Sequence, residues 1–478
     1  MLELMIHLDS DSGKPLYEQI YDYIRIHIAD GKISRGEKLP STRLLSGYLQ
    51  VSRSTVELAY EQLLSEGYIE SQPGRGYYAG DISDLYLTGQ AEKQNQKERK
   101  ISALEGIPSS QSVCRYRIDF SSDENEYRYF PYNAWRKISK ELLAADDPSL
   151  FCAGEAAGEM ELREAVCKYL YHARGVNCSP GQIIIGAGNE YLLILLSQVL
   201  GGGKRVAIEN PTYLKAYATL TNLNYEMLPT GMDKSGIRME EIRTDNPDII
   251  YIMPSHQFPM GTVMPMKRRL ELLHWASEKD HRYIIEDDHD SEFRYKGKPI
   301  PSLQGNDTHG TVIYIGTFSK SISPAIRVSY MVLPEKLLEN YYKNCGFYAS
   351  TVPKEQQKML TAFLNGGYFE RYLNKMRRVY KGKHDVFLSL LKKENWIHKI
   401  YGDYAGMHLL AELNTEKSAL WVVEQAKEKG IRVYALEEYM ISGTKPSEGA
   451  YATLLLGYGA LTEEEMKEGI ECIRGILL

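Results

Sequence analysis

Residues 316–327 read GTFSKSISPAIR and follow TVIYI, an apolar and β-rich run at residues 311–315. The run predicts a strand, so we expect Lys320 just beyond a strand end. A lysine there, among small hydroxyl residues and seven positions before Arg327, suits a cofactor with an aldehyde and a phosphate. The amine can form a Schiff base, while hydroxyls and a forked guanidinium hold phosphate oxygens. An isolated lysine in a serine-rich loop is more often a surface residue, so this interpretation depends on the rest of the chain.

A second motif of this kind lies upstream, where residues 283–290 read YIIEDDHD. A carboxylate at Asp287 that faces a pyridine nitrogen would keep that nitrogen protonated, because a nearby opposite charge favours the charged form. The protonated ring then acts as an electron sink. The alternative is that three acidic residues in four mark a solvated turn.

Three further segments follow predicted strands. Residues 182–191, QIIIGAGNEY, read as strand, glycine turn and helix, an arrangement that aims backbone N–H groups at an anion. Residues 209–213, ENPTY, follow RVAI and offer Tyr213 to stack on a flat cofactor. Residues 253–261, MPSHQFPMG, follow IIYI. Each signal is weak alone, but five in chain order indicate one site at the carboxyl ends of parallel strands.

From about residue 115 onward the chain resembles fold type I pyridoxal-phosphate aminotransferases. Its SHQFPMG and EDDHDSEF segments are closest to the MocR/GabR-type regulators, in which such a domain follows a GntR-type DNA-binding domain. The resemblance implies an α/β large domain with a mostly parallel sheet and helices on both faces, and a small α+β C-terminal subdomain at about 370–478. It also implies pyridoxal 5'-phosphate as cofactor, in a Schiff base with Lys320. The cofactor-binding residues it implies are Asp287, His289, Tyr213, Gly188, Asn189, Thr317, Ser319, Arg327 and His256.

The N-terminal residues predict an α+β winged helix-turn-helix domain. Apolar residues recur at helical spacing at positions 16, 20, 24 and 28, after a proline. A second helix is expected after Ser41 and a third after Ser52, since serine is a favoured N-cap. The third helix should end at Gly67. Two short strands, 68–70 and 76–78, would flank Pro-Gly-Arg and form a wing.

The winged helix predicts double-stranded DNA, an operator, as a partner. In a helix-turn-helix the first residues of the second helix of the pair face base edges. Arg53, Ser54 and Thr55 hold those positions, while Arg43 can reach phosphate and Arg75 lies at the wing tip. Four basic residues face one acidic residue between positions 35 and 53, and such a stripe can neutralise phosphates. A protein-binding winged helix is the alternative, although the PSTR, SRSTV and GRGYY segments resemble the GntR signature.

Composition agrees with a large, multidomain chain. It has 478 residues, of which 43% are hydrophobic, and a net charge of −6. The six cysteines lack CxxC or Cys/His ligand spacing, so neither a disulfide framework nor a metal site is expected. No signal peptide or membrane-spanning run is recognisable, which predicts a cytoplasmic protein without a membrane partner.

We expect a DNA-binding domain at residues 1–80, a linker at 81–115 and an effector domain at 116–478. The linker is polar and charged, and if flexible it would span about 30–35 Å. The family resemblance implies a head-to-tail homodimer.

Four positions depart from the family pattern. His289 stands where the regulators have a tyrosine, and the charge of an imidazole varies near neutral pH. Leu455 and Lys215 stand where aminotransferases carry carboxylate-binding arginines, and Ala153 replaces a tyrosine that contacts the phosphate from the partner subunit. Cofactor capture is therefore expected to persist. Lys215 remains as an effector-binding candidate, and efficient turnover of α-amino acids is not expected.

Two functions stay open. The first is a transcription regulator that senses an amine, an amino acid or the cofactor itself through Lys320. The alternative is an active aminotransferase that carries an accessory DNA-binding domain. Fold alone does not decide between them, but the fused DNA-binding domain and the missing arginine favour the regulator.

Overall fold

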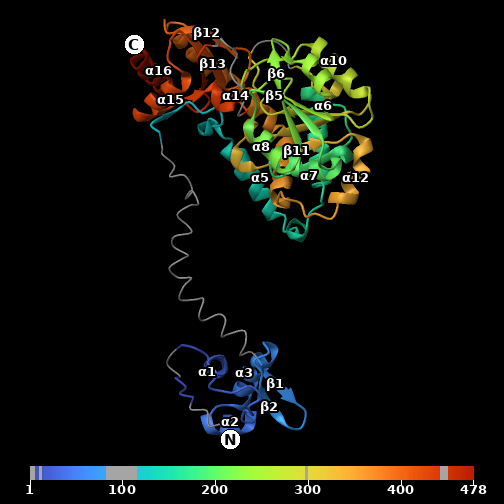
Figure 1. Ribbon diagram of the computed structural model, residues 1–478, viewed down its shortest axis with the longest axis vertical. Coiled ribbons are helices and arrows are strands. Elements are labelled where there is room, and N and C mark those ends of the chain that lie inside the picture. Colours follow the sequence, from blue (N-terminus) through green and yellow to red (C-terminus); the bar gives the residue numbers. More distant parts are fainter. Residues whose placement is uncertain (1–5, 10–12, 82–115, 296–299, 442–450) are drawn as a thin grey trace. The chain divides into compact units, whose positions relative to one another are not determined.

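The computed structural model describes residues 6–9, 13–81, 116–295, 300–441 and 451–478 (Figure 1). The chain divides into two compact units, Met1–Cys114 and Arg115–Leu478. Of the linker expected at 81–115, residues 82–115 lie outside the described residues. Among the residues described, no helix has both the length and the apolar character needed to cross a membrane.

The first unit contains the predicted winged helix. Its elements in chain order are α1 (Leu16–Ala29), α2 (Thr42–Leu49), α3 (Arg53–Ser65), β1 (Ile69–Gln72) and β2 (Gly76–Ala79). Ile20, Ile24 and Ile28 lie on one face of α1 and are buried in a cluster with Val56 and Tyr60 of α3. β1 and β2 pair antiparallel and form the wing.

The second unit is built on an eight-stranded sheet in the order β4-β11-β10-β9-β8-β5-β6-β7. These strands are β4 (Ile183–Gly186), β5 (Arg205–Asn210), β6 (Glu226–Asp233), β7 (Gly236–Ile237), β8 (Ile249–Ile252), β9 (Tyr283–Asp288), β10 (Val312–Thr317) and β11 (Ser329–Val332). Strands β10, β9, β8, β5 and β6 run parallel. β11 is antiparallel to both of its neighbours and β7 to β6. The mostly parallel sheet is thus confirmed at its centre.

Helices cover both faces of this sheet (Figure 1). The helices α7 (Asn189–Leu200), α8 (Leu214–Asn222) and α12 (Glu335–Cys345) supply one apolar layer. The opposite face packs against α6 (Met160–Arg174), α9 (Met239–Asp245), α10 (Met266–Ser277) and α13 (Lys354–Asn365), with α5 (Tyr132–Ala144) outside them. In β8, Ile249 and Tyr251 enter the first layer and Ile250 and Ile252 the second. Burial on both faces explains why this strand is apolar throughout.

A smaller α+β layer follows. Strands β12 (Ile397–Tyr401), β13 (His408–Leu413), β16 (Thr453–Gly457) and β15 (Tyr434–Ala435) form an antiparallel sheet, and β14 (Ile431–Arg432) pairs with β3 (Ile118–Asp119). The helices α15 (Ala419–Glu428) and α16 (Glu463–Leu477) pack on it. The long helix α14 (Tyr368–Leu391) serves both layers, because Phe369 packs in the large layer and Phe387 in the small one. This layer therefore includes β3, which the sequence did not predict.

Candidate functional site

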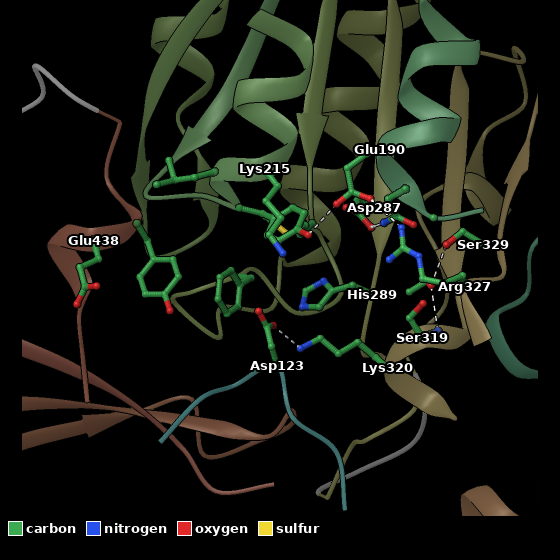
Figure 2. Close-up of a pocket in the computed structure, with 18 residues that line it drawn as sticks. Asp123, Glu190, Lys215, Asp287, His289, Ser319, Lys320, Arg327, Ser329 and Glu438 are labelled. Atoms are coloured by element: carbon green, nitrogen blue, oxygen red, sulfur yellow. Dashed lines mark hydrogen bonds and ion pairs between the residues drawn. The ribbon is translucent and has the colours of Figure 1, made fainter. Parts of the chain in front are cut away.

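A cavity of ≈ 260 Å³ lies at the carboxyl ends of the parallel strands (Figure 2). The segments that follow β4, β5, β8, β9 and β10 each contribute to its wall. Its lining residues are Asp123, Gly188, Asn189, Glu190, Tyr213, Leu214, Lys215, Met253, Phe258, Asp287, His289, Thr317, Ser319, Lys320, Arg327, Ser329, Glu438 and Tyr439. The five sequence motifs thus meet at one edge of the sheet, as such an arrangement of parallel strands requires.

Lys320 lies on α11 (Phe318–Ser321), a single turn that begins where β10 ends. The Thr317 side chain caps this turn by accepting a hydrogen bond from the Ser319 N–H at 3.1 Å. The Lys320 Nζ donates to the Ser122 carbonyl and to Asp123 Oδ1, both at 2.8 Å. The nearby Lys320 charge lowers the pKa of Asp123. The only lysine of the GTFSKSISPAIR stretch is therefore held at the cavity wall.

Asp287 lies near the end of β9 and is 3% exposed. Asn189 Nδ2 donates to its Oδ1 at 3.3 Å, and the Tyr251 hydroxyl donates to its Oδ2. Burial raises the pKa of Asp287. Glu286 and Asp288 are also buried, so the alternative of a solvated acidic turn is wrong. A buried carboxylate at the cavity wall gains from a cationic partner, and a protonated pyridine nitrogen would be one.

The part of the cavity wall formed by Gly188 and Arg327 can hold an anion. Gly188 has φ +105° and precedes α7, whose first turn carries free N–H groups. A Cβ at Gly188 would lie 2.4 Å from Arg327 Nη2 and would displace the guanidinium, and the φ of +105° itself favours glycine here. Arg327 Nη2 donates to the Ala187 carbonyl at 3.2 Å. The hydroxyls of Thr317, Ser319 and Ser329 lie on the same wall.

Tyr213, Lys215 and His289 line the rest of the cavity. The Tyr213 hydroxyl donates to Glu190 Oε1 at 3.3 Å, and the Lys215 Nζ lies 5.9 Å from the centre of the Tyr213 ring. His289 Nε2 is 3.4 Å from Asp290 Oδ1. Figure 2 shows the His289 ring between Lys215 and Asp123.

His256 differs from its expected place. It is 3% exposed and is not among the described residues that line the cavity. Its Nδ1 is 2.9 Å from Asp290 Oδ2. Burial disfavours its charged form, but Asp290 outweighs this and raises the pKa of His256. His256 therefore holds Asp290, which lies beside His289, and does not itself line the cavity. In the part of the chain that the structure describes, His256, His289 and Asp290 form a group that could hold a metal ion, since their ligand atoms lie within 4.8 Å of one another.

The residues present fit pyridoxal phosphate. Asn189 Oδ1 and His289 Nε2 are buried atoms with no hydrogen-bond partner in the described part of the chain, and both belong to lining residues. A ring with a phenolic oxygen and a nitrogen would bring polar groups to this region, where buried polar atoms need partners. Gly188 and the Arg327 guanidinium beside it form a cradle that suits a phosphate. Lys320, whose amine would join the aldehyde, lines the same cavity.

Several lining residues carry no sequence signal for this site. Asp123 is 197 residues from its partner Lys320, and the segment around it has no motif. Glu438 and Tyr439 come from a short turn after β15. Glu190 could have been found, because it lies within the GAGNEY segment that predicts the anion site. Of the departures, Leu455 is fully buried in β16 and Ala153 is exposed.

Loss of the Arg327 side chain should weaken cofactor binding. We expect Arg327→Ala to reduce the affinity for pyridoxal phosphate by about 1.5–3 kcal/mol, the value of a charged hydrogen bond. Arg327→Lys should recover only part of this, because lysine keeps the charge without the fork. Fluorescence titration of the apoprotein measures both. Equal affinities for all three proteins would remove Arg327 from the phosphate site.

The winged helix presents the five predicted DNA-binding residues on two helix starts and the wing. Ser41 caps α2 and Ser52 caps α3, each through its side-chain oxygen. Arg53 is the first residue of α3, and its Nε donates to Glu57 Oε1 at 2.7 Å. Arg43 on α2 and Arg75 in the wing turn are exposed.

Ser54 and Thr55 differ in how free they are. Ser54 is exposed, whereas Thr55 is half-buried. The Ser52 Oγ lies 2.8 Å from the Ser54 hydroxyl and 2.6 Å from the Thr55 hydroxyl. Both hydroxyls thus contact the capping Ser52, and Arg53 and Ser54 are the more exposed of the three predicted residues at the start of α3.

Removal of Arg53 should relax the DNA sequence preference. We expect Arg53→Ala to cost about 1–3 kcal/mol on the preferred sequence and little on unrelated DNA. Arg43→Ala and Arg75→Ala should weaken binding evenly across sequences and lower the salt slope by about one each. Mobility-shift assays over a salt series separate these outcomes. Wild-type binding by all three variants would mean that the winged helix has another partner.

Comparison with known proteins finds the same two parts. Residues 118–473 match the family "Aminotransferase class I and II", and residues 16–78 match "Bacterial regulatory proteins, gntR family". The chain is 37% identical over 461 residues to the "Uncharacterized HTH-type transcriptional regulator YdeL" of Bacillus subtilis, covering 96% of each chain. It is 31% identical over 487 residues to the "Probable rhizopine catabolism regulatory protein MocR" of Rhizobium meliloti, covering 99% of this chain and 96% of the relative.

Among solved structures, the chain is similar to the kynurenine aminotransferase of Pyrococcus horikoshii in complex with PMP. The TM-score is 0.65 with 25% identity, and the match covers 80% of this chain and 95% of that one.

Proposed function

This chain belongs to the family of MocR-type transcription regulators, in which a GntR-type winged helix is joined to an aminotransferase-like domain, and from this premise we propose that a ligand at Lys320 controls operator binding. Pyridoxal phosphate is the cofactor of the aminotransferase-like domain. The observation that carries the proposal is the convergence of Lys320, Asp287 and the Gly188–Arg327 cradle on one cavity in a chain with a winged helix.

Each part of the cavity has a proposed task. Bound pyridoxal phosphate supplies an aldehyde that combines with amines and a ring that withdraws electrons when protonated. Asp287 holds the proton on the ring nitrogen, and Tyr213 covers the ring face. Arg327 and the N–H groups at the start of α7 hold the phosphate. Lys320 offers its amine to the aldehyde, and Lys215 is available to the effector.

Several finer statements are part of the same proposal. The DNA-binding domain comprises residues 1–80, the linker 81–115 and the effector domain 116–478, with the small subdomain at about 370–478. The protein works in the cytoplasm as a head-to-tail homodimer on a double-stranded operator. The effector is an amine or an amino acid.

A spectroscopic titration beside a DNA-binding assay tests the proposal. Candidate amines are added to the cofactor-loaded protein while its visible absorbance is recorded, and the same mixtures are run in a mobility-shift assay on the DNA upstream of its own gene. We expect one compound to change both the absorbance and the DNA affinity. A compound that changes the absorbance over its full range without any effect on DNA affinity would contradict ligand control.

Transamination should be slow. Proton removal from a bound amino acid needs its Cα–H bond held perpendicular to the ring, which a carboxylate clamp achieves in aminotransferases. Here the wall offers Lys215, a point charge that orients a carboxylate less well than a forked arginine. We expect amines to alter the spectrum. Keto acid should form at a rate far below the kcat of typical enzymes, which is about 1–10³ s⁻¹. Rapid multiple turnover with any common amino acid and keto acid pair would favour the alternative, an active aminotransferase.

A further inference from the structure

The carboxylates that line the cavity differ in their partners. Each of three is bound by a side chain other than Lys320: Glu190 by Tyr213, Asp287 by Tyr251 and Glu438 by Arg432. Asp123 is the exception in the part of the chain that the structure describes, because the hydrogen bond and ion pair of its carboxylate are both with Lys320. When the Lys320 nitrogen is engaged elsewhere, Asp123 therefore loses its counter-ion.

Asp123 lies next to the nitrogen on which the proposed function depends. Its Oδ1 is 2.8 Å from the Lys320 Nζ, and the Ser122 carbonyl accepts from the same nitrogen at 2.8 Å. Figure 2 shows the Asp123 carboxylate pointing into the cavity toward the Lys320 nitrogen, below the His289 ring. One carboxylate and one carbonyl form a subsite for an ammonium group, since both are acceptors and one is charged.

We propose that Asp123 makes this cavity a site for primary amines that carry no carboxylate on the amine-bearing carbon. This inference rests on the proposed function, in which the effector amine must come to the place of the Lys320 nitrogen. At that place an ammonium group is attracted by Asp123. An α-carboxylate carbon lies about 2.5 Å from its own amine nitrogen, so in an α-amino acid it would come within a few ångströms of the Asp123 carboxylate. Two like charges that close repel each other, although water screens part of the repulsion because 64% of the Asp123 side chain is exposed.

Two further cations of the cavity wall do not pair with Asp123 in the part of the chain that the structure describes. Arg327 binds the Ala187 carbonyl and lies 3.8 Å from Glu190. Lys215 supplies one mobile charge without a fork. The nearby Lys320 charge, together with Lys215 and His289, lowers the pKa of Asp123, so its carboxylate is charged at neutral pH.

Matched pairs of ligands test the inference. The amines 2-phenylethylamine and 3-methylbutylamine differ from L-phenylalanine and L-leucine by one α-carboxylate. Their dissociation constants would be measured by calorimetry on the full-length, cofactor-loaded wild type, Asp123→Asn and Asp123→Glu, with cofactor occupancy checked by visible absorbance. Glu416→Gln, which removes an exposed carboxylate from the β13–α15 loop, controls for net charge.

For the wild type we expect each amine to bind at least about tenfold more tightly than its amino acid. Asp123→Asn should bring each pair to nearly equal affinity, while Asp123→Glu and Glu416→Gln keep the preference. Amino acids that bind the wild type as tightly as the amines, or a preference that survives in Asp123→Asn, would overturn the inference and leave the proposed function standing. Failure of every amine and amino acid to bind the wild type would overturn both.

Discussion

Lys320→Ala should abolish the visible absorbance that pyridoxal phosphate acquires when it is joined to a lysine amine. The expected effect is complete, because among the described residues Lys320 is the lysine on the turn after β10, and its Nζ lies at the cavity wall. Lys215 also lines the cavity, but it comes from the start of α8 after a different strand. Absorbance spectra of the purified variant with added cofactor measure the effect.

The control for this variant is Lys343→Ala. Lys343 is an exposed residue of α12 and is not among the residues that line the cavity. Its spectrum should match that of the wild type. If Lys320→Ala kept the wild-type visible spectrum, another lysine would carry the cofactor, and borohydride reduction followed by mass analysis of the modified peptide would identify it.

Leu455→Arg should destabilise the second unit without restoring amino acid turnover. Leu455 is fully buried in β16, opposite Leu410 of β13 and Tyr434 of β15. It belongs to the same apolar cluster as Phe258, and Tyr439 packs against this cluster. The centres of the Phe258 and Tyr439 rings are 5.1 Å apart, in edge-to-face contact. An arginine there would bury a charge without a partner or displace this pair. We expect a loss of about 3–5 kcal/mol in the free energy of unfolding.

Thermal unfolding followed by circular dichroism measures this loss, with Leu455→Met as the matched control. Methionine is close to leucine in volume, so that variant should lose less than about 1.5 kcal/mol. A stable Leu455→Arg protein with rapid transamination would show that the cavity can accept the arginine. In that case the single departure at Leu455 would account for the slow turnover expected of the wild type.

The strand-end motifs could be predicted from sequence for a physical reason. Parallel strands place their carboxyl ends at one edge, so Gly188, Tyr213, Asp287 and Lys320 had to meet once the strands were recognised. Local signals also predicted the winged helix: Ser41 and Ser52 are favoured helix caps, and Pro-Gly-Arg is a favoured turn. These signals are local, and each survives in a single sequence.

Other features depend on long-range packing that no local pattern encodes. Asp123 reaches Lys320 across 197 positions because β3 pairs with β14 and brings the start of this unit to the cavity. His256 is in a predicted motif, yet its ring turns toward Asp290 behind the wall. The antiparallel direction of β11 follows from the short turn after Lys320, since β10 and β11 pair directly. To predict such placements, the register of the whole sheet must be known.

The central claim is that chemistry at Lys320 controls DNA binding, and one measurement tests it most directly. A mobility-shift titration on the upstream operator would compare wild type and Lys320→Ala, each with and without the amine that changes the wild-type spectrum. We predict that the amine changes the operator affinity of the wild type by about 5–150-fold, the range of typical allosteric coupling, and leaves that of Lys320→Ala unchanged. An equal response of the two proteins to the amine would contradict the account.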